Sequence, residues 1–521
     1  MFKLHSALIA LLSIGFAASD DTNMVGQQQD ETITVVNNLV DGCVIDYNPL
    51  ADIDYFPSKY SSPIIQTYGD IDIFGEKFVP HNSTDYLEIT YHKTYKIVTN
   101  KHQNPPRSYL LYQCGTEIPQ DVVDANDFDV VVPVPLQNGI AITQTTQIPY
   151  LELLGLREEV VAYIGNADYV SSPCMKHMLE EETIETFFDW DFDTMSALVD
   201  DFRARNPDTI IVSGPTNNVV GENVVVASAT QERTNVATFD WIHFYAAFFN
   251  MEGEAKRIAQ SAQDSYDCSS EVARDIAKQQ RELEVEEESF EKPVIFWGSY
   301  YYDWSVAECP TWDHTYYCEY AEHCGATILS RPEGVGFNQT WGTSVYWYLK
   351  TEEVFELAKD ADIFIYSGTN WDATYAKFNE TLDQFKSVQN KMVFDIQGQG
   401  SAAWFEQRYA EYDVVGLDFC AAVGHTSATG PVHERRWLRN VFTEPIGSLP
   451  TCDVEGGEVS QPYVPPGQEC VRPQDDSVDF GSEDLVEEDL EDGADALNDS
   501  SAVSASLTGL VFALVATAVA L

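Results

Sequence analysis

Basic residues are scarce in this chain of 521 residues. Lysine and arginine together number 29, against 84 aspartate and glutamate residues, so the formal net charge is −55 at pH 7. Such an acidic surface repels both phosphate backbones and anionic lipid headgroups. The composition therefore argues against nucleic acid and against an anionic membrane face as partners.

Signatures of the common catalytic sites are also missing. The sequence has no G-x-S-x-G, no H-E-x-x-H, no G-x-x-x-x-G-K-[ST] and no C-x-x-C. An enzyme on this chain would need an acid/base pair that the sequence does not reveal. We therefore expect a protein that is not an enzyme, with no catalytic residues, no metal ligands and no cofactor.

Strongly apolar runs without charge are found at the two ends of the chain. Residues 1–19 combine a short basic start, an apolar run and small residues at a cleavage point, which is typical of a secretory signal peptide. Residues 500–521 begin with small residues and end in an apolar tail from Leu507 to Leu521, which is short for a bilayer. This pattern predicts a GPI-anchor signal and a place on the outer face of the cell membrane. A marginal membrane-spanning helix is the alternative.

Ten cysteines, an even number, lie between these two ends. In the oxidising secretory pathway we expect them to form disulfides, although the sequence does not give their pairing. N-glycosylation acceptors stand at Asn82, Asn338 and Asn379, with a fourth at Asn498. Both features agree with a secreted glycoprotein.

Strand and helix patterns alternate in two stretches of the chain, as expected for βαβ units with parallel sheets. The first stretch has expected strands at 130–134, 139–143, 160–165, 208–214 and 223–228, and an expected helix at 193–205. Another helix is expected with Pro149 in its first turn, and Gly155 can end it in the left-handed conformation. The second has expected strands at 294–300, 326–330, 362–368 and 391–397, and helices at 314–324, 344–358 and 381–388. Helical spacing at 241–259 and 271–288 predicts a long helical segment between them. The prediction is an α/β fold of two Rossmann-like lobes with mainly parallel sheets, joined by a long helical spine.

These patterns divide the chain into seven segments. In order we expect a signal peptide (1–19), a β-rich N-terminal extension with antiparallel strands (20–121), lobe I (122–238), the helical spine (239–291), lobe II (292–450), an acidic stalk (451–499) and the anchor signal or membrane tail (500–521). The stalk is predicted to be extended because its like charges repel one another. A long helical spine predicts only a small hinge rotation between the lobes.

Several segments resemble class III periplasmic substrate-binding proteins of ABC transporters, which bind ferric siderophores, haem or cobalamin. The likeness includes TTQIPYLELLGLREEVVAYIGNADYV (145–170), KPVIFWGSYYYDW (292–304), ADIFIYSGTNW (361–371) and AAWFEQRYAEYDVVGLDF (402–419). The resemblance implies a two-lobed solute-binding protein with a membrane uptake system as its partner. The family is bacterial, however, and the chain departs from it in its tail, its sequons and its cysteines, and in residues 420–450. These departures leave the uptake partner open.

In two-lobed binders the ligand lies where the C-terminal ends of strands from both lobes meet. Aromatic side chains there offer flat walls for a tetrapyrrole or a catecholate, and hydroxyl and amide groups orient the ligand. The predicted ligand-binding residues are Thr145, Thr146 and Tyr169 of lobe I, and Tyr300, Tyr301, Trp304, Asn370, Trp371, Gln399 and Trp404 of lobe II. The alternative is that several of these are ordinary core or surface aromatics.

Two further clusters have competing interpretations. The stretch 309–324 (CPTWDHTYYCEYAEHC) holds zinc-type ligands, but its spacing fits no standard zinc pattern and disulfides are favoured. His425 and His433 lie near Arg435 and Arg436, where they could bind a ligand carboxylate or form structural ion pairs.

Together these observations predict a cell-surface protein that captures a metal chelate, namely a ferric siderophore, haem or a corrinoid, for uptake. The alternative is a non-transport surface glycoprotein, adhesive or wall-associated, on the same scaffold. Both remain open at this point because a fold does not determine a function.

Overall fold

The computed structural model describes most of the chain between Leu39 and Cys470. The described residues are 39, 42–51, 53–56, 84–215, 219, 221–283, 292–309, 315–341, 344–426, 433–452, 458–466 and 470. All of them belong to one unit, Val35–Leu521. The predicted signal peptide, the sequons at Asn82 and Asn498, and the apolar tail lie outside the described residues.

An N-terminal sheet with the strand order β1-β2-β3-β4 precedes lobe I. Its elements are β1 (Leu87–Tyr91), β2 (Tyr95–Asn100), β3 (Arg107–Gln113), α2 (Gln120–Ala125) and β4 (Val130–Val134). The first three strands are antiparallel, as predicted. β4 is parallel to β3, with Tyr109 opposite Val130, so this sheet continues past residue 121, where the sequence placed the end of the N-terminal extension.

Lobe I contains a sheet with the order β7-β6-β5-β8-β9, in which every pairing is parallel. Because β5 is first in sequence and central in the sheet, the direction of winding reverses between β5 and β8. Ligand sites of doubly wound sheets lie at such a switch point. The elements are β5 (Ile140–Ile142), α3 (Ile148–Leu153), β6 (Val160–Tyr163), α4 (Pro173–Glu180), β7 (Glu185–Thr186), α5 (Phe192–Arg205), β8 (Ile210–Ser213), β9 (Val224–Val226) and α6 (Asn235–Phe239).

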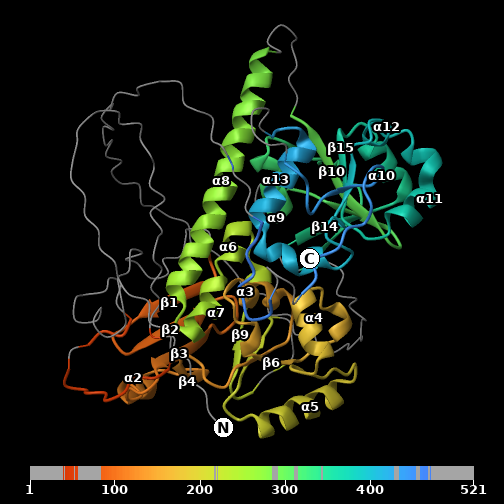
Figure 1. The fold of residues 1–521 in the computed structure, drawn as a ribbon. Helices are drawn as coiled ribbons and strands as arrows, with labels where there is room; N and C mark the ends of the chain where they lie inside the picture. Colours follow the sequence, from red (N-terminus) through yellow and green to blue (C-terminus); the bar gives the residue numbers. More distant parts are fainter. Residues whose placement is uncertain are drawn as a thin grey trace, which may run out of the picture. The chain divides into compact units, whose positions relative to one another are not determined.

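The spine consists of α7 (Ile242–Phe249) and the 32-residue α8 (Glu252–Leu283), which is the long green helix of Figure 1. The predicted continuous helix at 241–259 is wrong, because Asn250 adopts a left-handed conformation (φ 58°) and ends α7. Its side chain is held by Lys96 Nζ at 2.9 Å and by Gln113 Oε1 at 3.0 Å, which fixes this break. α8 packs against α7, α9 and α13.

Lobe II contains a mixed sheet with the order β13-β14-β11-β10-β15-β16-β17, and β12 also pairs with β10. β10 is parallel to β12 and β15, and β15 is parallel to β16, whereas the remaining pairings are antiparallel. The strands are β10 (Val294–Tyr300), β11 (Trp304–Ala307), β12 (Thr327–Ile328), β13 (Phe337–Trp341), β14 (Ser344–Leu349), β15 (Ile363–Tyr366), β16 (Val393–Asp395) and β17 (Arg439–Asn440). The helices are α9 (Tyr316–His323), α10 (Thr351–Ala358), α11 (Trp371–Leu382), α12 (Lys386–Gln389) and α13 (Tyr412–Val423).

Two predicted helices of lobe II are wrong. The first half of 344–358 is strand β14, whose sequence SVYWYL is β-branched and aromatic and pairs with β11 and β13. The helix predicted at 381–388 is divided, since α11 ends at Leu382 and α12 starts at Lys386. The α/β fold class is confirmed, with an all-parallel sheet in lobe I and a parallel centre with antiparallel additions in lobe II.

The predicted disulfides are confirmed, and all ten cysteines take part. The pairs are Cys43–Cys114, Cys174–Cys452, Cys268–Cys470, Cys309–Cys318 and Cys324–Cys420. Since the cysteines of 309–324 are all oxidised, that stretch has no thiolate to offer a zinc ion. Across the described ranges, no group of three or more His, Cys, Asp or Glu side chains is placed to hold a metal ion. In the same ranges, no helix has the length and apolarity to cross a membrane.

Candidate functional site

The switch point of lobe I is closed by polar side chains. After β5 the chain enters a short 3-10 helix, Thr145–Gln147, and the Gln147 side-chain oxygen accepts the backbone N–H of Thr143 (2.9 Å) and of Gln144 (3.1 Å). At the end of β8, Gly214 donates its backbone N–H to Thr143 Oγ1 at 3.2 Å. A Cβ atom on Gly214 would overlap the end of the Gln144 side chain, so a larger residue there would displace that side chain. The ends of β5 and β8 are therefore joined by hydrogen bonds.

A carboxylate from lobe II reaches the next strand end of lobe I. Glu406 accepts the backbone N–H groups of Ser171 (2.8 Å) and Ser172 (2.7 Å) at the start of α4. An acidic group at a helix N-terminus is stabilised by the helix dipole. Burial nevertheless raises the pKa of Glu406 to about 7, with these hydrogen bonds opposing the shift. The two lobes are thus connected by a buried carboxyl group that titrates near neutral pH.

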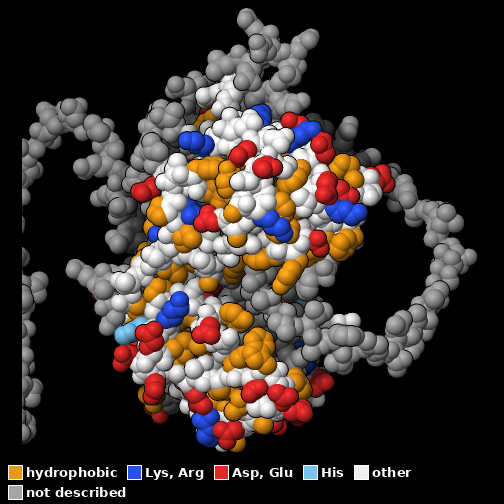
Figure 2. Space-filling model, turned by 90° about the vertical axis from the view of Figure 1, so that its right-hand side faces the viewer, with side chains coloured by type: hydrophobic (Ala, Val, Ile, Leu, Met, Phe, Trp, Pro, Cys, Tyr) orange, Lys and Arg blue, Asp and Glu red, His pale blue; other side chains and the backbone are white. Residues whose placement is uncertain are grey.

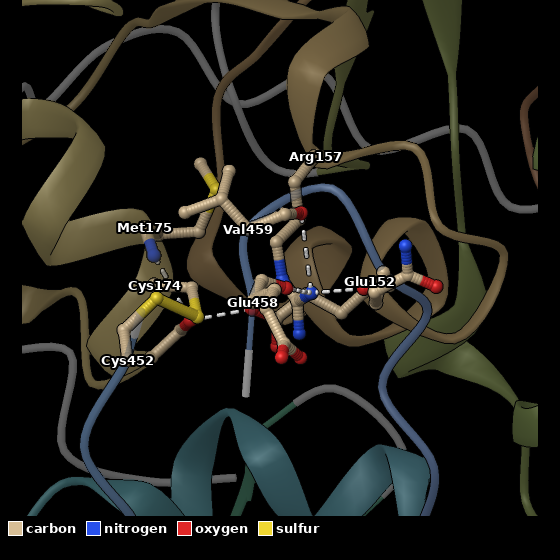
Figure 3. Close-up of a disulfide and its surroundings, with 9 residues drawn as sticks. Glu152, Arg157, Cys174, Met175, Cys452, Glu458 and Val459 are labelled. Carbon is tan, nitrogen blue, oxygen red and sulfur yellow. Dashed lines mark hydrogen bonds and ion pairs between the residues drawn. A yellow bond between two sulfur atoms is a disulfide. The ribbon is translucent and has the colours of Figure 1, made fainter. Parts of the chain in front are cut away.

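The C-terminal strap, defined as residues 446–452 and 458–466, runs over the same part of lobe I. Figure 3 shows its disulfide from Cys452 to Cys174 of α4, beside the ion pair of Arg157 with Glu152. Arg157 Nε donates to Glu152 Oε1 at 2.8 Å, and Arg157 Nη1 donates to the carbonyl oxygens of Gln461 (2.5 Å) and Glu458 (3.3 Å). The buried guanidinium of Arg157 therefore binds the strap to lobe I.

The strap also contacts lobe II. Gly447 donates its backbone N–H to the carbonyl oxygen of Gln397 at 3.1 Å, and the Tyr463 hydroxyl donates to the buried carboxylate of Glu411. Farther along, Cys470 is bonded to Cys268 of α8. The described part of the predicted stalk is therefore tied to lobe I, lobe II and the spine, and the rest of the stalk lies outside the described residues.

The switch point of lobe II lies between β10 and β15 and is organised by tyrosines. Tyr366 Oη lies 2.8 Å from Thr374 Oγ1 and donates to Asn370 Oδ1 at 2.7 Å, and Asn370 Nδ2 donates to the carbonyl oxygen of Tyr300 at 2.9 Å. Burial raises the pKa of Tyr366 to about 12, so its hydroxyl keeps its proton. This network orients the Asn370 side chain at the C-terminal ends of both strands.

A buried arginine lies where the lobes touch. Arg408 is on the 3-10 helix Gln407–Ala410, which packs against α3 of lobe I, and it is 5% exposed. Its guanidinium carbon lies 4.2 Å from the ring centre of Tyr316, 4.7 Å from that of Tyr409 and 5.1 Å from that of Trp404. Arg408 Nε donates to the Trp404 carbonyl oxygen at 3.0 Å. Among the residues that the structure describes, no carboxylate forms an ion pair with Arg408.

The predicted ligand-binding residues fall into three groups. Thr145, Thr146, Tyr300 and Asn370 are half-buried, and Tyr169 and Tyr301 are exposed. Trp304, Trp371, Trp404 and Gln399 are buried, and the indole N–H of Trp304 has no hydrogen-bond partner within the described part of the chain. Within that part, no hydrogen bond or ring contact joins the three lobe I residues to the seven of lobe II. Their role in binding stays a prediction.

The histidine and arginine cluster after α13 forms structural contacts. Arg436 pairs with Glu411 at 2.8 Å, Arg435 pairs with Glu444, and His433 pairs with Asp418. His425 contacts backbone and amide oxygens rather than a carboxylate. The structural alternative for this cluster therefore describes it better than a carboxylate site for a ligand.

Sequence reasoning missed Glu406, Arg408, Arg157 and the strap. One signal for Arg408 was present, because a basic residue within the apolar stretch AAWFEQRYAEY is unusual in a chain with so few basic residues. The role of Arg157 had no such signal, since it depends on contacts with residues about 300 positions away. Of the predicted glycosylation sites, Asn338 lies on β13 and Asn379 is exposed on α11; their modification stays a prediction.

Searches with sequence found no match, either to a protein-family model or to a curated protein. Searches with structure found similar folds among bacterial binding proteins. Helicobacter pylori CeuE with Ni(II) bound is 13% identical, and the match covers 57% of this chain and 88% of CeuE with a TM-score of 0.37. The vitamin B12 binding protein BtuF of Vibrio cholerae is 13% identical over 55% of this chain and 96% of BtuF, with a TM-score of 0.35. The ABC-type Fe³⁺-hydroxamate transport protein of Saccharomonospora viridis is 14% identical over 56% of this chain and 93% of its own, with a TM-score of 0.35. Likenesses at this level say nothing about the ligand of this chain.

Proposed function

We propose that this chain is a solute-binding protein that holds a small anionic ligand where its two lobes meet. The single observation that carries this proposal is Arg408, a buried guanidinium surrounded by aromatic rings at the contact between the lobes. A buried cation is costly when no anion pairs with it, and among the residues that the structure describes no carboxylate forms an ion pair with Arg408. Contacts with the ring faces recover part of that cost. An acidic group of a ligand would supply the rest through a charge-assisted hydrogen bond.

The ligand class that we propose is a metal chelate, namely a ferric siderophore, haem or a corrinoid. Carboxylate or catecholate groups would pair with Arg408, and flat aromatic parts would stack on its half-buried neighbour Tyr316. The half-buried Tyr300 and Asn370 at the lobe II switch point would give further polar contacts. The proposal assigns binding and release to these residues, and no catalytic step.

The experiment is a binding titration of the purified chain with ferric siderophores, haemin and cobalamin. We expect at least one of them to bind with a Kd below about 10 µM, which corresponds to about −7 kcal/mol. Arg408→Gln should weaken the binding of an acidic chelate by about tenfold or more, the effect of one charge-assisted contact. Arg331→Gln is the matched control, because Arg331 also stacks on an aromatic ring (Trp347) but already pairs with Glu308. If no chelate binds, or if both variants weaken binding equally, the proposal fails.

We also propose that the chain is displayed on the outer cell surface by a GPI anchor and delivers its ligand to a membrane uptake system. The small residues at 498–502 and the uncharged tail from Leu507 support this address. A phosphatidylinositol-specific phospholipase should release the protein from intact cells into the aqueous phase. Detection of peptides from Leu507–Leu521 in the mature protein would contradict the anchor.

A non-transport surface glycoprotein is the second candidate function, and one observation favours it. The lobes are linked by Glu406 at Ser171 and Ser172, and by a disulfide-bonded strap, so there is little freedom to open. Solution scattering with and without a chelate, together with the titration, separates the two candidates. Chelate binding with a small change in the scattering profile agrees with capture by a nearly rigid protein. No binding and no change in the profile favours the glycoprotein.

A further inference from the structure

A group of exposed aromatic rings lies at the start of α5 in lobe I. Phe188, Trp190 and Phe192 are 38%, 67% and 60% exposed, and the rings of Phe188 and Trp190 are in contact with centroids 4.8 Å apart. Single exposed aromatics are common, but neighbouring ones usually mark an interaction site. We call these three residues with Asp189 and Asp193 the acidic aromatic patch. Figure 2 shows hydrophobic side chains among acidic ones on the lower part of the molecule, where α5 lies in Figure 1.

The local fold holds these rings outward without using them in the core. Phe187 points the other way and packs on Phe202 of α5, with ring centroids 5.8 Å apart. Asp191 caps α5 by accepting the backbone N–H of Thr194 at 2.9 Å. The backbone on both sides of the patch is thus held in place, which lowers the cost of ordering this segment around a partner.

The sequence around the rings is strongly acidic, although Arg205 of α5 pairs with Glu185. Residues 180–193 contain seven acidic residues and no basic one. All seven acidic side chains are exposed. Carboxylates that surround exposed ring faces attract lysine and arginine in two ways, through ion pairs and through cation–π contacts. The chemistry therefore selects a cationic partner.

The edge of the lobe I sheet indicates that this partner is a peptide. β7 is the last strand in the order β7-β6-β5-β8-β9, and in the described part of the chain it pairs with β6 alone. Its outer edge offers backbone donors and acceptors, which an extended chain can meet by strand addition. β7 is continuous with the patch, since it ends at Thr186 and Phe188 follows two residues later.

We propose that the acidic aromatic patch and the edge of β7 form a docking surface for an extended, lysine- or arginine-rich segment of another protein. The segment adds along β7 with its backbone. Its basic side chains then lie over Trp190 and Phe192 and pair with Asp189 and Asp193. This surface is separate from the ligand site at Arg408, so its failure would leave the proposed solute binding untouched.

The test uses the full chain and a fluorescent peptide of alternating lysine and valine, followed by anisotropy. We expect saturable binding that weakens strongly when salt is raised from about 50 mM to about 500 mM. Trp190→Ala with Phe192→Ala should weaken binding by about tenfold, the effect of two cation–π contacts. Asp189→Asn with Asp193→Asn should weaken it as well, and Asp191 is left intact because it caps α5.

Tyr302→Ala is the matched control, because Tyr302 is 94% exposed and lies in lobe II. It should leave binding unchanged, and circular dichroism should show all variants folded. Three results would overturn the proposal: no binding of the peptide, equal binding of spermine (which shows that charge alone suffices), or a dimer that Trp190→Ala dissociates (which assigns the patch to a second copy of the chain). Displacement of the peptide by an unlabelled lysine–valine peptide but not by a glutamate–valine peptide would support it.

Discussion

Lobe I and lobe II are stabilised by different means around their switch points. In lobe I, a buried ion pair, Arg157–Glu152, a carboxyl group from lobe II and a disulfide to the distant strap surround α4. In lobe II, the centre of the sheet is covered by aromatic rings that lie close together in one cluster, such as Phe296, Phe364 and Trp371. Polar contacts require each partner to be present, whereas apolar packing is shared among many neighbours.

This difference means that lobe I depends on parts of the chain that are far away in sequence. Removal of one polar partner leaves the other buried charge unpaired, and neighbouring residues do not supply a replacement partner. Lobe II also has a buried ion pair, Arg439–Asp395, but both of its members lie within lobe II. Substitutions in each lobe can therefore test whether lobe I is more easily destabilised than lobe II.

The largest effect is expected from Arg157→Met in lobe I. Both members of its pair with Glu152 are buried, with side-chain exposures of 5% and 4%. We expect the free energy of unfolding to fall by about 3–5 kcal/mol, because the variant leaves a buried carboxylate unpaired. Urea unfolding followed by tryptophan fluorescence measures this loss. Arg205→Met, which removes an exposed pair with Glu185 in the same lobe, should change stability little, and an equal loss in both variants would contradict the argument.

The next effect concerns the strap disulfide. Cys174→Ser with Cys452→Ser removes a link that spans 278 residues, and should cost about 2–4 kcal/mol as the unfolded chain gains freedom. The matched control within lobe II is Cys309→Ser with Cys318→Ser, a link that spans 9 residues. We expect the control to cost less, since a short loop restricts the unfolded chain less. Thermal unfolding of the two double variants gives the comparison, and the reverse order would show that loop length does not decide it.

A smaller effect should appear in the pH dependence of the contact between the lobes. Burial raises the pKa of Glu406 from 4.5 to about 7, so the folded chain binds this proton more tightly than the unfolded chain does. Stability from this group is therefore complete below about pH 4.5, and is lost as the pH rises towards 7. Its contribution should be on the order of 1–3 kcal/mol between about pH 7.5 and about pH 5.

Glu406→Gln isolates that contribution, because glutamine keeps an oxygen for Ser171 N–H and does not titrate. The variant should lose less stability than the natural chain when the pH is raised from about 5 to about 7.5. Other groups act in the same interval. Burial lowers the pKa of His323 to about 4, so its contribution falls as the pH drops below 6.5. Only the difference between variant and natural chain is therefore informative, and identical pH profiles would contradict the assignment.

The smallest effect is expected in the antiparallel part of lobe II. Arg331 lies over the ring of Trp347 on β14, with its guanidinium carbon 3.0 Å from the ring centre. Arg331→Ala should lower the free energy of unfolding by about 1 kcal/mol, the size of one cation–π contact. Arg331→Lys should retain part of it. A loss as large as that of Arg157→Met would show that this edge is as vulnerable as lobe I.

The sequence predicted lobe I well because its signals are local. The strand at 160–165 is a short apolar run, and it forms β6 at Val160–Tyr163. Pro149 and Gly155 mark the ends of α3, and Gly155 has the expected left-handed conformation with φ 69°. Features of this kind depend on neighbouring residues alone.

Lobe II was predicted less well because two of its segments are ambiguous on their own. Residues 344–349 form an apolar run that fits either a helix or a strand, and their pairing with β11 and β13 decides for the strand. The break at Asn250 likewise depends on Lys96 and Gln113, which lie more than 130 positions earlier. In both cases tertiary contacts decide between local structures that the sequence alone leaves open.

For the candidate site, the sequence indicated positions in the fold but not contacts. The structure has Tyr300 at the end of β10 and Asn370 shortly after β15, where they are joined by a hydrogen bond, and their role in ligand binding stays a prediction. The contact of Glu406 with Ser171 joins residues 235 positions apart, and no periodic pattern encodes such a pair. Contacts of this separation appear only after the fold is known.

The disulfide between Cys268 and Cys470 has a mechanical consequence. Cys268 is buried in the middle of α8, so the chain that follows Cys470 is fastened covalently to the spine. Tension applied through that following segment enters the molecule at the middle of α8. Because the bond bypasses the strap, such a force would not be carried first by the hydrogen bonds of Arg157 or Glu406. A force on the chain beyond Cys470 would then act on α8 first, and the contact between the lobes would carry little of it.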